Sequence, residues 1–395
     1  MERRNQVFVV LASGFVLLGM ATTTPGVTWP SVAESFGRPL AELGLVTLLF
    51  GSGYTLSSAI NGRLIAGRGL GPVLVGSALT GTAALVGLAL SVGWPMFLLA
   101  IGLLGLGGGL VDAATNTYVA IRRGTRAMSL IHGIFGIGAI GGPLLVTALL
   151  QLGLPWRMAF ALLAVGQVAY VASLWLVSRR LSVRAQTEAE TPGLASARRQ
   201  SVAWSLAVFF VYAGIGVGAG AWAFTYLTEE QGLSDTAGGL VVAGYWAAFA
   251  ASRLLLGAVG DRVRPEAMLR WSPGATMVAF LGVWWSPEPW LGAAARIIAG
   301  VAHGPVVPME MLLTARRFRV ATTPRMIGFE IAAANIGGAI LPAIMGFGVG
   351  LAGLGVIPPF LVVNAAVLWV VITLLGRQPL VTRSPEASAP VTIGP

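Results

Sequence analysis

Residues 95–123 read PMFLLAIGLLGLGGGLVDAATNTYVAIRR, and this stretch carries the pattern that decides the fold. Up to residue 120 it contains apolar, small or weakly polar side chains and one carboxylate, Asp112, and it ends on two arginines. About 20 residues of this kind cross the hydrocarbon core of a bilayer as one helix. The stretch therefore predicts a transmembrane helix with a single acidic residue inside the membrane.

The rest of the chain has the same character, with 56% hydrophobic and 10% charged residues. This composition is typical of membrane proteins. The first stretch has no small-residue cleavage pattern and is not expected to be a signal peptide. We predict an all-α membrane protein with twelve transmembrane helices, which lie at about 7–29, 42–62, 72–92, 95–120, 127–150, 156–178, 203–227, 236–259, 267–286, 290–314, 326–350 and 355–376.

The net charge of +10 comes from 25 basic residues, most of which gather at every second helix end, against 15 acidic residues. Examples are Arg122 with Arg123, and Arg316 with Arg317, whereas the opposite ends carry LTEEQGLSD (227–235) and WSPEPW (285–290). Basic residues concentrate on the cytoplasmic side of membrane proteins. This pattern predicts a multi-pass protein of the cell (inner) membrane with both termini cytoplasmic, in contact with the lipid bilayer, and no nucleic-acid partner.

A polar interval at 178–201 separates two halves that repeat weakly at an offset of about 190–200 residues. RLIAG (63–67) matches RLLLG (253–257), and both the fifth and the eleventh stretch begin with an arginine, Arg126 or Arg325, and have a proline 17 residues later, Pro143 or Pro342. Internal repeats of one orientation are a feature of transporters. We predict a six-helix bundle at 1–180, a cytoplasmic linker at 181–201, a second six-helix bundle at 202–380 and a cytoplasmic tail at 381–395.

Several motifs resemble those of the major facilitator superfamily, and within it the branch of fucose:proton symporter-like sugar permeases. SRLLLGAVGDRV (252–263) resembles the superfamily loop motif, and VDAATNTYV (111–119), LIHGIFGIGAIGGPLL (130–145), VYAGIGVGAGAW (211–222), HGPVVP (303–308) and NIGGAILP (335–342) resemble the branch. The resemblance implies the major facilitator fold, in two parallel-repeat bundles, and proton-coupled sugar transport by alternating access. The chain departs from it at Gly26 and Gly216, where some relatives carry acids, and at Gly71, where Asp261 would repeat.

Asp112 is expected about 15 Å from the helix end at Arg122, near the middle of the bilayer. An ionised, unpaired carboxylate is costly there, and taking up a proton removes the charge. Asn116 follows at i+4 and Thr115 at i+3, so Asp112 has polar neighbours. We predict Asp112 as the proton-coupling residue, and the alternative is a structural acid satisfied by a neighbouring helix.

A substrate site is expected where polar and aromatic groups share this depth. The glycine-rich helices and the prolines of HGPVVP predict close helix packing and a break in the tenth helix. Sugar sites combine aromatic faces with a few polar groups. The predicted substrate-binding residues are Asn116, Tyr54, Trp222, Tyr245, Trp246, His303 and Asn335, and packing against lipid or core is the alternative for each.

Charged residues near the cytoplasmic ends predict a gate, because buried charges must be paired. Arg296 lies nearer the outer face and is expected to extend its guanidinium to the interface. His132 and His303 have no clustered ligands and are assigned to packing or hydrogen bonding. The predicted gate residues are Arg253, Asp261, Arg262, Glu310 and Glu330.

Two classes of function stay open. The first is proton-coupled symport of a small polar solute such as a monosaccharide, and the second is proton-coupled antiport that exports amphipathic compounds, since GAIGGP (138–143) partly matches an antiporter motif. A sugar uniporter is also compatible with the missing acid at Gly26. No enzyme motif is found, no cofactor or metal is expected, and the chain contains no cysteine. We expect a monomer whose partners are a small-molecule substrate and protons.

Overall fold

The computed structural model describes residues 2–122, 125–178, 181, 199–259, 262–318 and 322–378. These residues form α-helices joined by short turns, with no strand among them. The first half contains α1 (Glu2–Phe36), η1 (Leu40–Glu42), α2 (Leu43–Arg68), α3 (Leu70–Ala89), α4 (Trp94–Arg122), α5 (Thr125–Gln151) and α6 (Arg157–Ser178). The second half contains α7 (Arg199–Ala221), α8 (Ala223–Thr225), η3 (Tyr226–Glu230), α9 (Asp235–Val259), α10 (Pro265–Trp284), α11 (Pro289–His303), α12 (Val306–Arg317), α13 (Thr323–Ala352), η5 (Leu354–Val356) and α14 (Ile357–Gly376).

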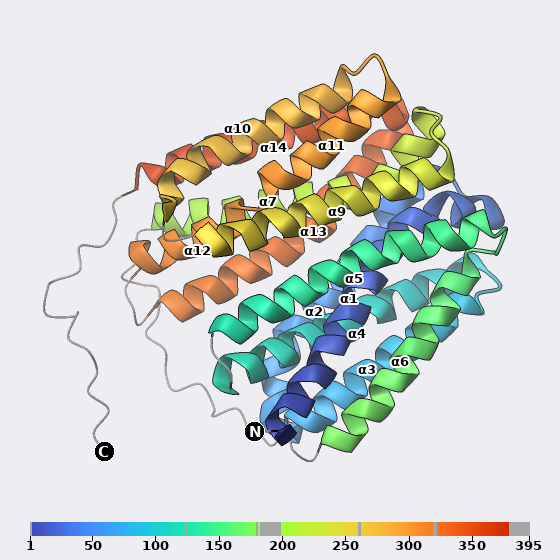
Figure 1. The fold of residues 1–395 in the computed structure, drawn as a ribbon, viewed down its shortest axis with the longest axis vertical. Helices are drawn as coiled ribbons and strands as arrows, with labels where there is room; N and C mark the ends of the chain where they lie inside the picture. Colours follow the sequence, from blue (N-terminus) through green and yellow to red (C-terminus); the bar gives the residue numbers. More distant parts are fainter. Residues whose placement is uncertain are drawn as a thin grey trace, which may run out of the picture.

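The long helices pack as two bundles, α1–α6 and α7–α14, which lie side by side in Figure 1. The bundles meet mainly where α2 packs on α13 and where α5 packs on α9. The expected all-α fold of two six-helix bundles is confirmed. The predicted linker at 181–201 lies, apart from residues 181 and 199–201, outside the described residues, and so does the tail at 381–395.

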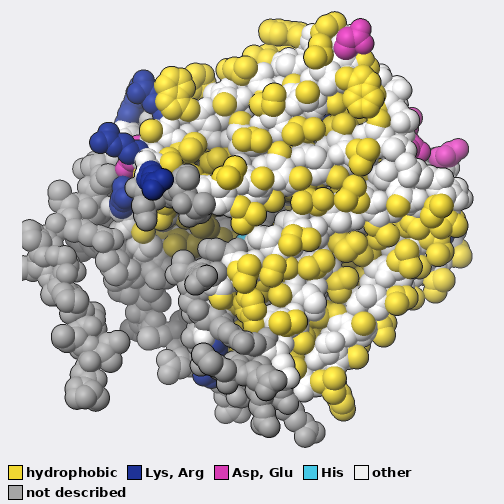
Figure 2. All heavy atoms as spheres, in the orientation of Figure 1, with side chains coloured by type: hydrophobic (Ala, Val, Ile, Leu, Met, Phe, Trp, Pro, Cys, Tyr) yellow, Lys and Arg dark blue, Asp and Glu magenta, His cyan; other side chains and the backbone are white. Residues whose placement is uncertain are grey.

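Eleven helical segments of the described chain are long and apolar enough to cross a membrane. The remaining predicted span, α10, is a helix of 20 residues that is less apolar because it carries Glu266, Arg270 and Pro273. It packs against α11 and α14, as a member of the second bundle. Figure 2 shows hydrophobic side chains spread over the flanks of both bundles, which suits a surface in contact with lipid.

The predicted break in the tenth membrane segment is present. α11 ends at His303 and α12 begins at Val306, so Gly304 and Pro305 separate two half-helices. Proline interrupts a helix because it lacks a backbone donor. A second break follows Ala221, where α7 gives way to α8 and the π-helical turn η3, and the sequence did not predict it.

The two bundles are joined most tightly at the end away from the termini. We call the end where α1 begins and α14 ends the terminal side, and the opposite end the far side. Near the far side, a Cβ atom on Gly26 of α1 would lie 2.7 Å from the carbonyl oxygen of Ala221 in α7. A Cβ on Gly346 of α13 would likewise lie 2.7 Å from the Cα of Gly44 in α2. Glycine therefore permits the backbones of opposite bundles to touch at this end.

A side-chain hydrogen bond also crosses between the bundles at the far side, where Gln151 Nε2 donates to Thr236 Oγ1 at 2.7 Å. Toward the terminal side the same interface helices offer more space: Gly62 of α2 and Gly328 of α13 have no described atom within 4 Å of where a Cβ would be. The described residues thus form a structure that is closed at the far side.

Candidate functional site

Asp112 lies on α4 among neutral hydrogen-bond donors. The Tyr54 hydroxyl, on α2, donates to Asp112 Oδ2 at 2.7 Å. The Asn116 amide, one turn further along α4, donates to Asp112 Oδ1 at 2.9 Å. The described partners of both carboxylate oxygens therefore carry no charge. The i+4 contact follows from helical spacing, whereas the contact with Tyr54 joins two helices.

His132 on α5 lies between this carboxylate and the second bundle. It interacts electrostatically with both Asp112 and Arg253, and Arg253 belongs to α9 across the interface. Its ring packs edge-on against Phe15, with centroids 5.9 Å apart. The sequence assigned His132 to packing or hydrogen bonding and missed this position between the bundles, because no local spacing relates α5 to α9.

The second bundle holds a matching polar cluster at the break between α11 and α12. His303 stacks on Tyr212 of α7 with ring centroids 4.2 Å apart, and its Nε2 lies 3.1 Å from the Tyr212 carbonyl oxygen. Arg253 donates through Nη2 to the Tyr212 hydroxyl at 2.6 Å and through Nε to the Gly304 carbonyl at 3.1 Å. The freed carbonyl at the break is thus used to hold the guanidinium.

The two clusters lie on helices that the sequence repeat relates. Tyr54 and Asp112 belong to α2 and α4 of the first bundle, and Tyr245 and His303 belong to α9 and α11 of the second. Unlike Tyr54, Tyr245 is fully buried and its hydroxyl has no partner among the described residues.

The other predicted substrate residues are placed differently from one another. Trp246 packs edge-on against Tyr245, with ring centroids 5.3 Å apart. The ring centroid of Phe249, also on α9, lies 6.1 Å from that of His303. Trp222 is fully buried and donates through Nε1 to the Pro342 carbonyl at 3.3 Å, so it anchors the end of α7 on α13. Asn335 lies on α13 and is half-buried.

The five predicted gate residues are not brought together in the part of the chain that the structure describes. Arg253 belongs to the Tyr212 cluster, Arg262 is exposed, and Asp261 lies outside the described residues. Their separation has a simple cause: depth along a helix does not determine its rotation, so residues at a similar depth can face different neighbours.

Glu310 and Glu330 do lie in one buried cluster of the second bundle. Glu310 forms a buried ion pair with Arg317, which the sequence analysis did not single out although it lies on the same helix. Glu330 on α13 accepts hydrogen bonds through Oε1 from Ser205 at 2.5 Å and from Thr314 at 2.7 Å. These contacts hold α7, α12 and α13 together within one bundle.

The expectation for Arg296 is wrong. Its side chain does not reach the interface but is fully buried, 0% exposed. Nη1 donates to the Ala219 carbonyl at 3.2 Å, and the guanidinium stands over the Tyr226 ring at 5.5 Å. The break after Ala221 brings these two groups to Arg296, and no proline or other helix-breaking pattern in the sequence predicted that break.

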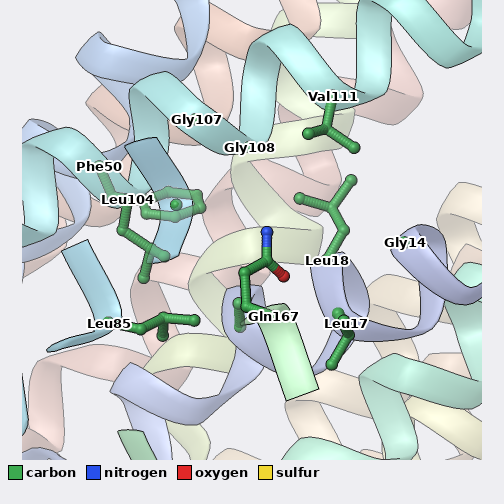
Figure 3. A pocket seen from close by; sticks show the side chains of 12 residues that line it. Gly14, Leu17, Leu18, Phe50, Leu85, Leu104, Gly107, Gly108, Val111 and Gln167 are labelled. Atoms are coloured by element: carbon green, nitrogen blue, oxygen red, sulfur yellow. The ribbon is translucent and has the colours of Figure 1, made fainter. Parts of the chain in front are cut away.

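A small cavity lies inside the first bundle, lined by apolar residues and glycines of α1, α2, α3 and α4 and by Gln167 of α6 (Figure 3). Its volume is about 30 Å³. Small-molecule sites measure roughly 300–1,000 Å³, so this cavity is large enough for water only.

The family model described as Major Facilitator Superfamily matches residues 10–290 and 206–395. The chain belongs to the Major Facilitator Superfamily. Members of this family are transporters, and this one is a multi-pass membrane protein whose expected partner is a small molecule.

Individual relatives are distant. The glucose/mannose transporter GlcP of Bacillus subtilis (strain 168) is 21% identical over 351 residues, which covers 84% of this chain and 85% of that protein. An uncharacterized transporter, y4wD, of Sinorhizobium fredii is 23% identical over 303 residues, covering 76% and 80%. The crystal structure of a bacterial homolog of the human lysosomal transporter Spinster, in an inward-facing and occupied conformation, superposes with a TM-score of 0.76 at 14% identity, covering 96% of this chain and 98% of that one. The similarity to this solved structure supports the assignment of the fold.

Proposed function

We propose that this chain is a proton-coupled symporter of a small polar solute such as a monosaccharide, and that Asp112 carries the proton. The observation behind the proposal is the environment of Asp112, whose carboxylate lies inside an apolar bundle with the neutral donors Tyr54 and Asn116 as its described partners. A carboxylate in such a place is stabilised by taking up a proton. The similarity to GlcP, a glucose/mannose transporter, supports a sugar as the solute.

The coupling step follows from the position of His132. A proton on Asp112 cancels the carboxylate charge, and its release restores an anion that interacts electrostatically with His132, which itself also interacts with Arg253 of the other bundle. In this proposal the charge on Asp112 acts on the second bundle through His132. A group whose charge biases two arrangements of the bundles couples proton movement to alternating access.

We place both termini in the cytoplasm of the cell, following the distribution of arginines. The terminal side is then cytoplasmic, and the closure at Gly26 and Gly346 makes the described conformation inward-facing. The solute path in this proposal runs between Asp112, Tyr54 and Asn116 on one side and His303, Tyr245 and Trp246 on the other. We also assign Asn335 to the solute path. Trp222 does not contact the solute in this proposal, but it holds the end of α7 against α13 beside the path.

The five predicted gate residues take different roles in this proposal. Glu310 and Glu330, with Arg317, stabilise the cytoplasmic end of the second bundle. Arg253 faces the interface next to His132, and in this proposal it is the gate residue that closes toward the first bundle in the outward-facing state. Asp261 and Arg262 keep the gate role predicted from the charged residues near the cytoplasmic helix ends.

The test is uptake of a panel of labelled monosaccharides by purified protein in proteoliposomes, with and without an inward proton gradient. Accumulation above equilibrium that requires the gradient supports the proposal. Equilibration without accumulation identifies a uniporter, and gradient-driven expulsion of lipophilic dyes identifies an antiporter. Either of these two results rejects symport.

A further inference from the structure

Arg296 is a buried cation whose hydrogen-bonding capacity is only partly used. It lies on α11, about 10 Å along the helix from its far-side end. One of its nitrogens, Nη1, donates to the Ala219 carbonyl. Nε and Nη2 are buried and have no hydrogen-bond partner among the described residues. Buried donors of a guanidinium are costly to leave unpaired.

No acidic side chain balances this charge in the part of the chain that the structure describes. The ion pairs found there join Arg38 to Glu42, Arg316 to Glu266 and Arg317 to Glu310. The titratable neighbours of Arg296 are two phenols, Tyr226 and Tyr245. A fully desolvated arginine normally has an anionic partner, and this one lacks it within the described chain.

Two further buried donors without partners among the described residues lie on α9, the helix that packs against α11. They are the Tyr245 hydroxyl and the Trp246 indole N–H. The Trp246 ring lies against Gly220, the residue that follows Ala219, and a Cβ there would lie 3.3 Å from the indole nitrogen. Arg296 and Trp246 therefore both contact the last turn of α7, Tyr245 packs against Trp246, and each of the three side chains offers hydrogen atoms without an acceptor.

We propose that Arg296, with Tyr245 and Trp246, binds the carboxylate group of the transported solute. The inference rests on the proposed transport function and narrows its substrate to sugar acids or similar hydroxylated organic acids. A guanidinium presents two parallel N–H donors that match a carboxylate. Hydroxyl-binding groups such as Asn116 and His303 remain available for the rest of the solute.

The position of Arg296 gives the anion an entry route. Ala219, which Arg296 holds, is two residues before Ala221, where α1 closes on α7 at Gly26. Opening the far side separates α1 from this end of α7 and uncovers the donors to the outside. A monocarboxylate that enters with one proton moves no net charge, whereas a neutral sugar with one proton moves one positive charge.

The binding test uses the full-length protein in detergent and pairs of neutral sugar and sugar acid: glucose with glucuronate, and galactose with galacturonate. Affinity is measured by calorimetry and by tryptophan fluorescence, with sodium chloride as the inorganic-anion probe. We expect at least one acid to bind about 10- to 100-fold more tightly than its neutral partner, the size of a charge-assisted hydrogen bond. Arg296→Gln removes this preference, Arg296→Lys retains part of it, and the exposed-residue control Arg270→Gln leaves it unchanged.

Three results overturn the inference: neutral sugars that bind as tightly as their acids, a preference that survives Arg296→Gln, or chloride that displaces the acid at equal concentration, which identifies an inorganic-anion site only. If Arg296→Gln does not fold, transport by the wild-type protein still tests the inference. Proton-driven uptake of a sugar acid that generates no current supports the inference. Proton-driven uptake of neutral sugars alone, with a current, overturns it and leaves the proposed symport standing, whereas dye expulsion without sugar or acid uptake rejects symport itself.

Discussion

The Tyr54 hydroxyl donates to the Asp112 carboxylate across 2.7 Å and so joins α2 to α4 within the first bundle. α2 is also the helix that meets α13 of the second bundle at Gly44 and Gly346. The residue that holds the proposed proton carrier therefore belongs to a helix of the bundle interface. A change of charge at Asp112 acts directly on a helix that must move when the far side opens.

The first prediction removes this link. Tyr54→Phe keeps the aromatic ring but deletes the donor to Asp112, so the carboxylate loses one of its two described partners. Hydrogen bonds to charged groups contribute about 1.5–3 kcal/mol, and we expect proton-driven accumulation to fall by at least ~10-fold. Initial rates of gradient-driven uptake measure the effect.

A matched control is available in the same bundle. Tyr170 is buried and its hydroxyl has no partner among the described residues. Tyr170→Phe makes the same chemical change without removing a hydrogen bond, and we expect uptake within about twofold of the wild type, since a buried unpaired hydroxyl costs stability rather than contributing to it. Equal losses in the two variants would show that the hydroxyl of Tyr54 has no special role.

The second prediction concerns the acid itself. Asp112→Asn keeps the size of the side chain and one acceptor oxygen, and its NH2 group can donate to the Tyr54 hydroxyl oxygen or to Asn116 Oδ1, but it cannot release a proton. Gradient-driven accumulation should vanish, because the amide imitates the protonated carboxyl permanently. Exchange of labelled against unlabelled solute should survive, since it needs the protonated form only. Full accumulation by the variant would exclude Asp112 as the proton carrier, and loss of exchange as well would make it a solute-binding residue.

The third prediction compares how much Glu310 and Glu330 of the second bundle contribute to the stability of the folded protein. Glu310→Gln leaves Arg317 buried without a counter-ion, and breaking a buried pair in this way costs about 3–5 kcal/mol. Glu330→Gln keeps an acceptor for Ser205 and Thr314, so its midpoint of thermal unfolding should stay close to that of the wild type. Scanning fluorimetry of the purified variants measures both.

The exposed pair of Arg316 and Glu266 is the control for this experiment. Both side chains are 54% exposed, so Glu266→Gln should cost under about 1 kcal/mol. An equally large loss in Glu330→Gln would mean that Glu330 is ionised and paired in the folded protein, contrary to its present contacts with hydroxyl groups.

Sequence reasoning succeeded where the information is local. The apolar stretches predicted every membrane helix, and the prolines of HGPVVP predicted the break between α11 and α12. The contact between Asp112 and Asn116 follows from the i+4 spacing of one helix. These features depend on neighbours within one or two helical turns, which a single sequence displays.

The contacts between helices were not accessible in the same way. Tyr54 and Asp112 are 58 positions apart, and His132 interacts electrostatically with Arg253 of the other bundle. The position of Arg296 in its helix gave its depth correctly but not the direction of its side chain, so a buried cation was mistaken for an interfacial one. Rotation of a helix about its own axis is determined by packing partners that lie far away in the sequence.

The fourth prediction tests the closure at the far side. A Cβ on Gly26 would lie 2.7 Å from the carbonyl oxygen and 2.9 Å from the Cα of Ala221, and these are backbone atoms that cannot rotate away. Gly26→Ala should therefore push α1 from α7 and shift the population toward the state that is open at the far side. Gly62→Ala is the control on α2, because no described atom lies within 4 Å of its new methyl group.

The absence of cysteine allows the shift to be measured with site-directed spin labels. Labels at Gln151→Cys and Thr236→Cys report the far side, where the two native side chains are hydrogen-bonded across the bundles. Labels at Leu130→Cys on α5 and Leu254→Cys on α9, both exposed, report the terminal side. In the Gly26→Ala background the far-side distance should gain a longer component and the terminal-side distance a shorter one, while Gly62→Ala leaves both unchanged. Unaltered distances in Gly26→Ala would mean that α1 and α7 adapt locally and that their contact does not control the closure.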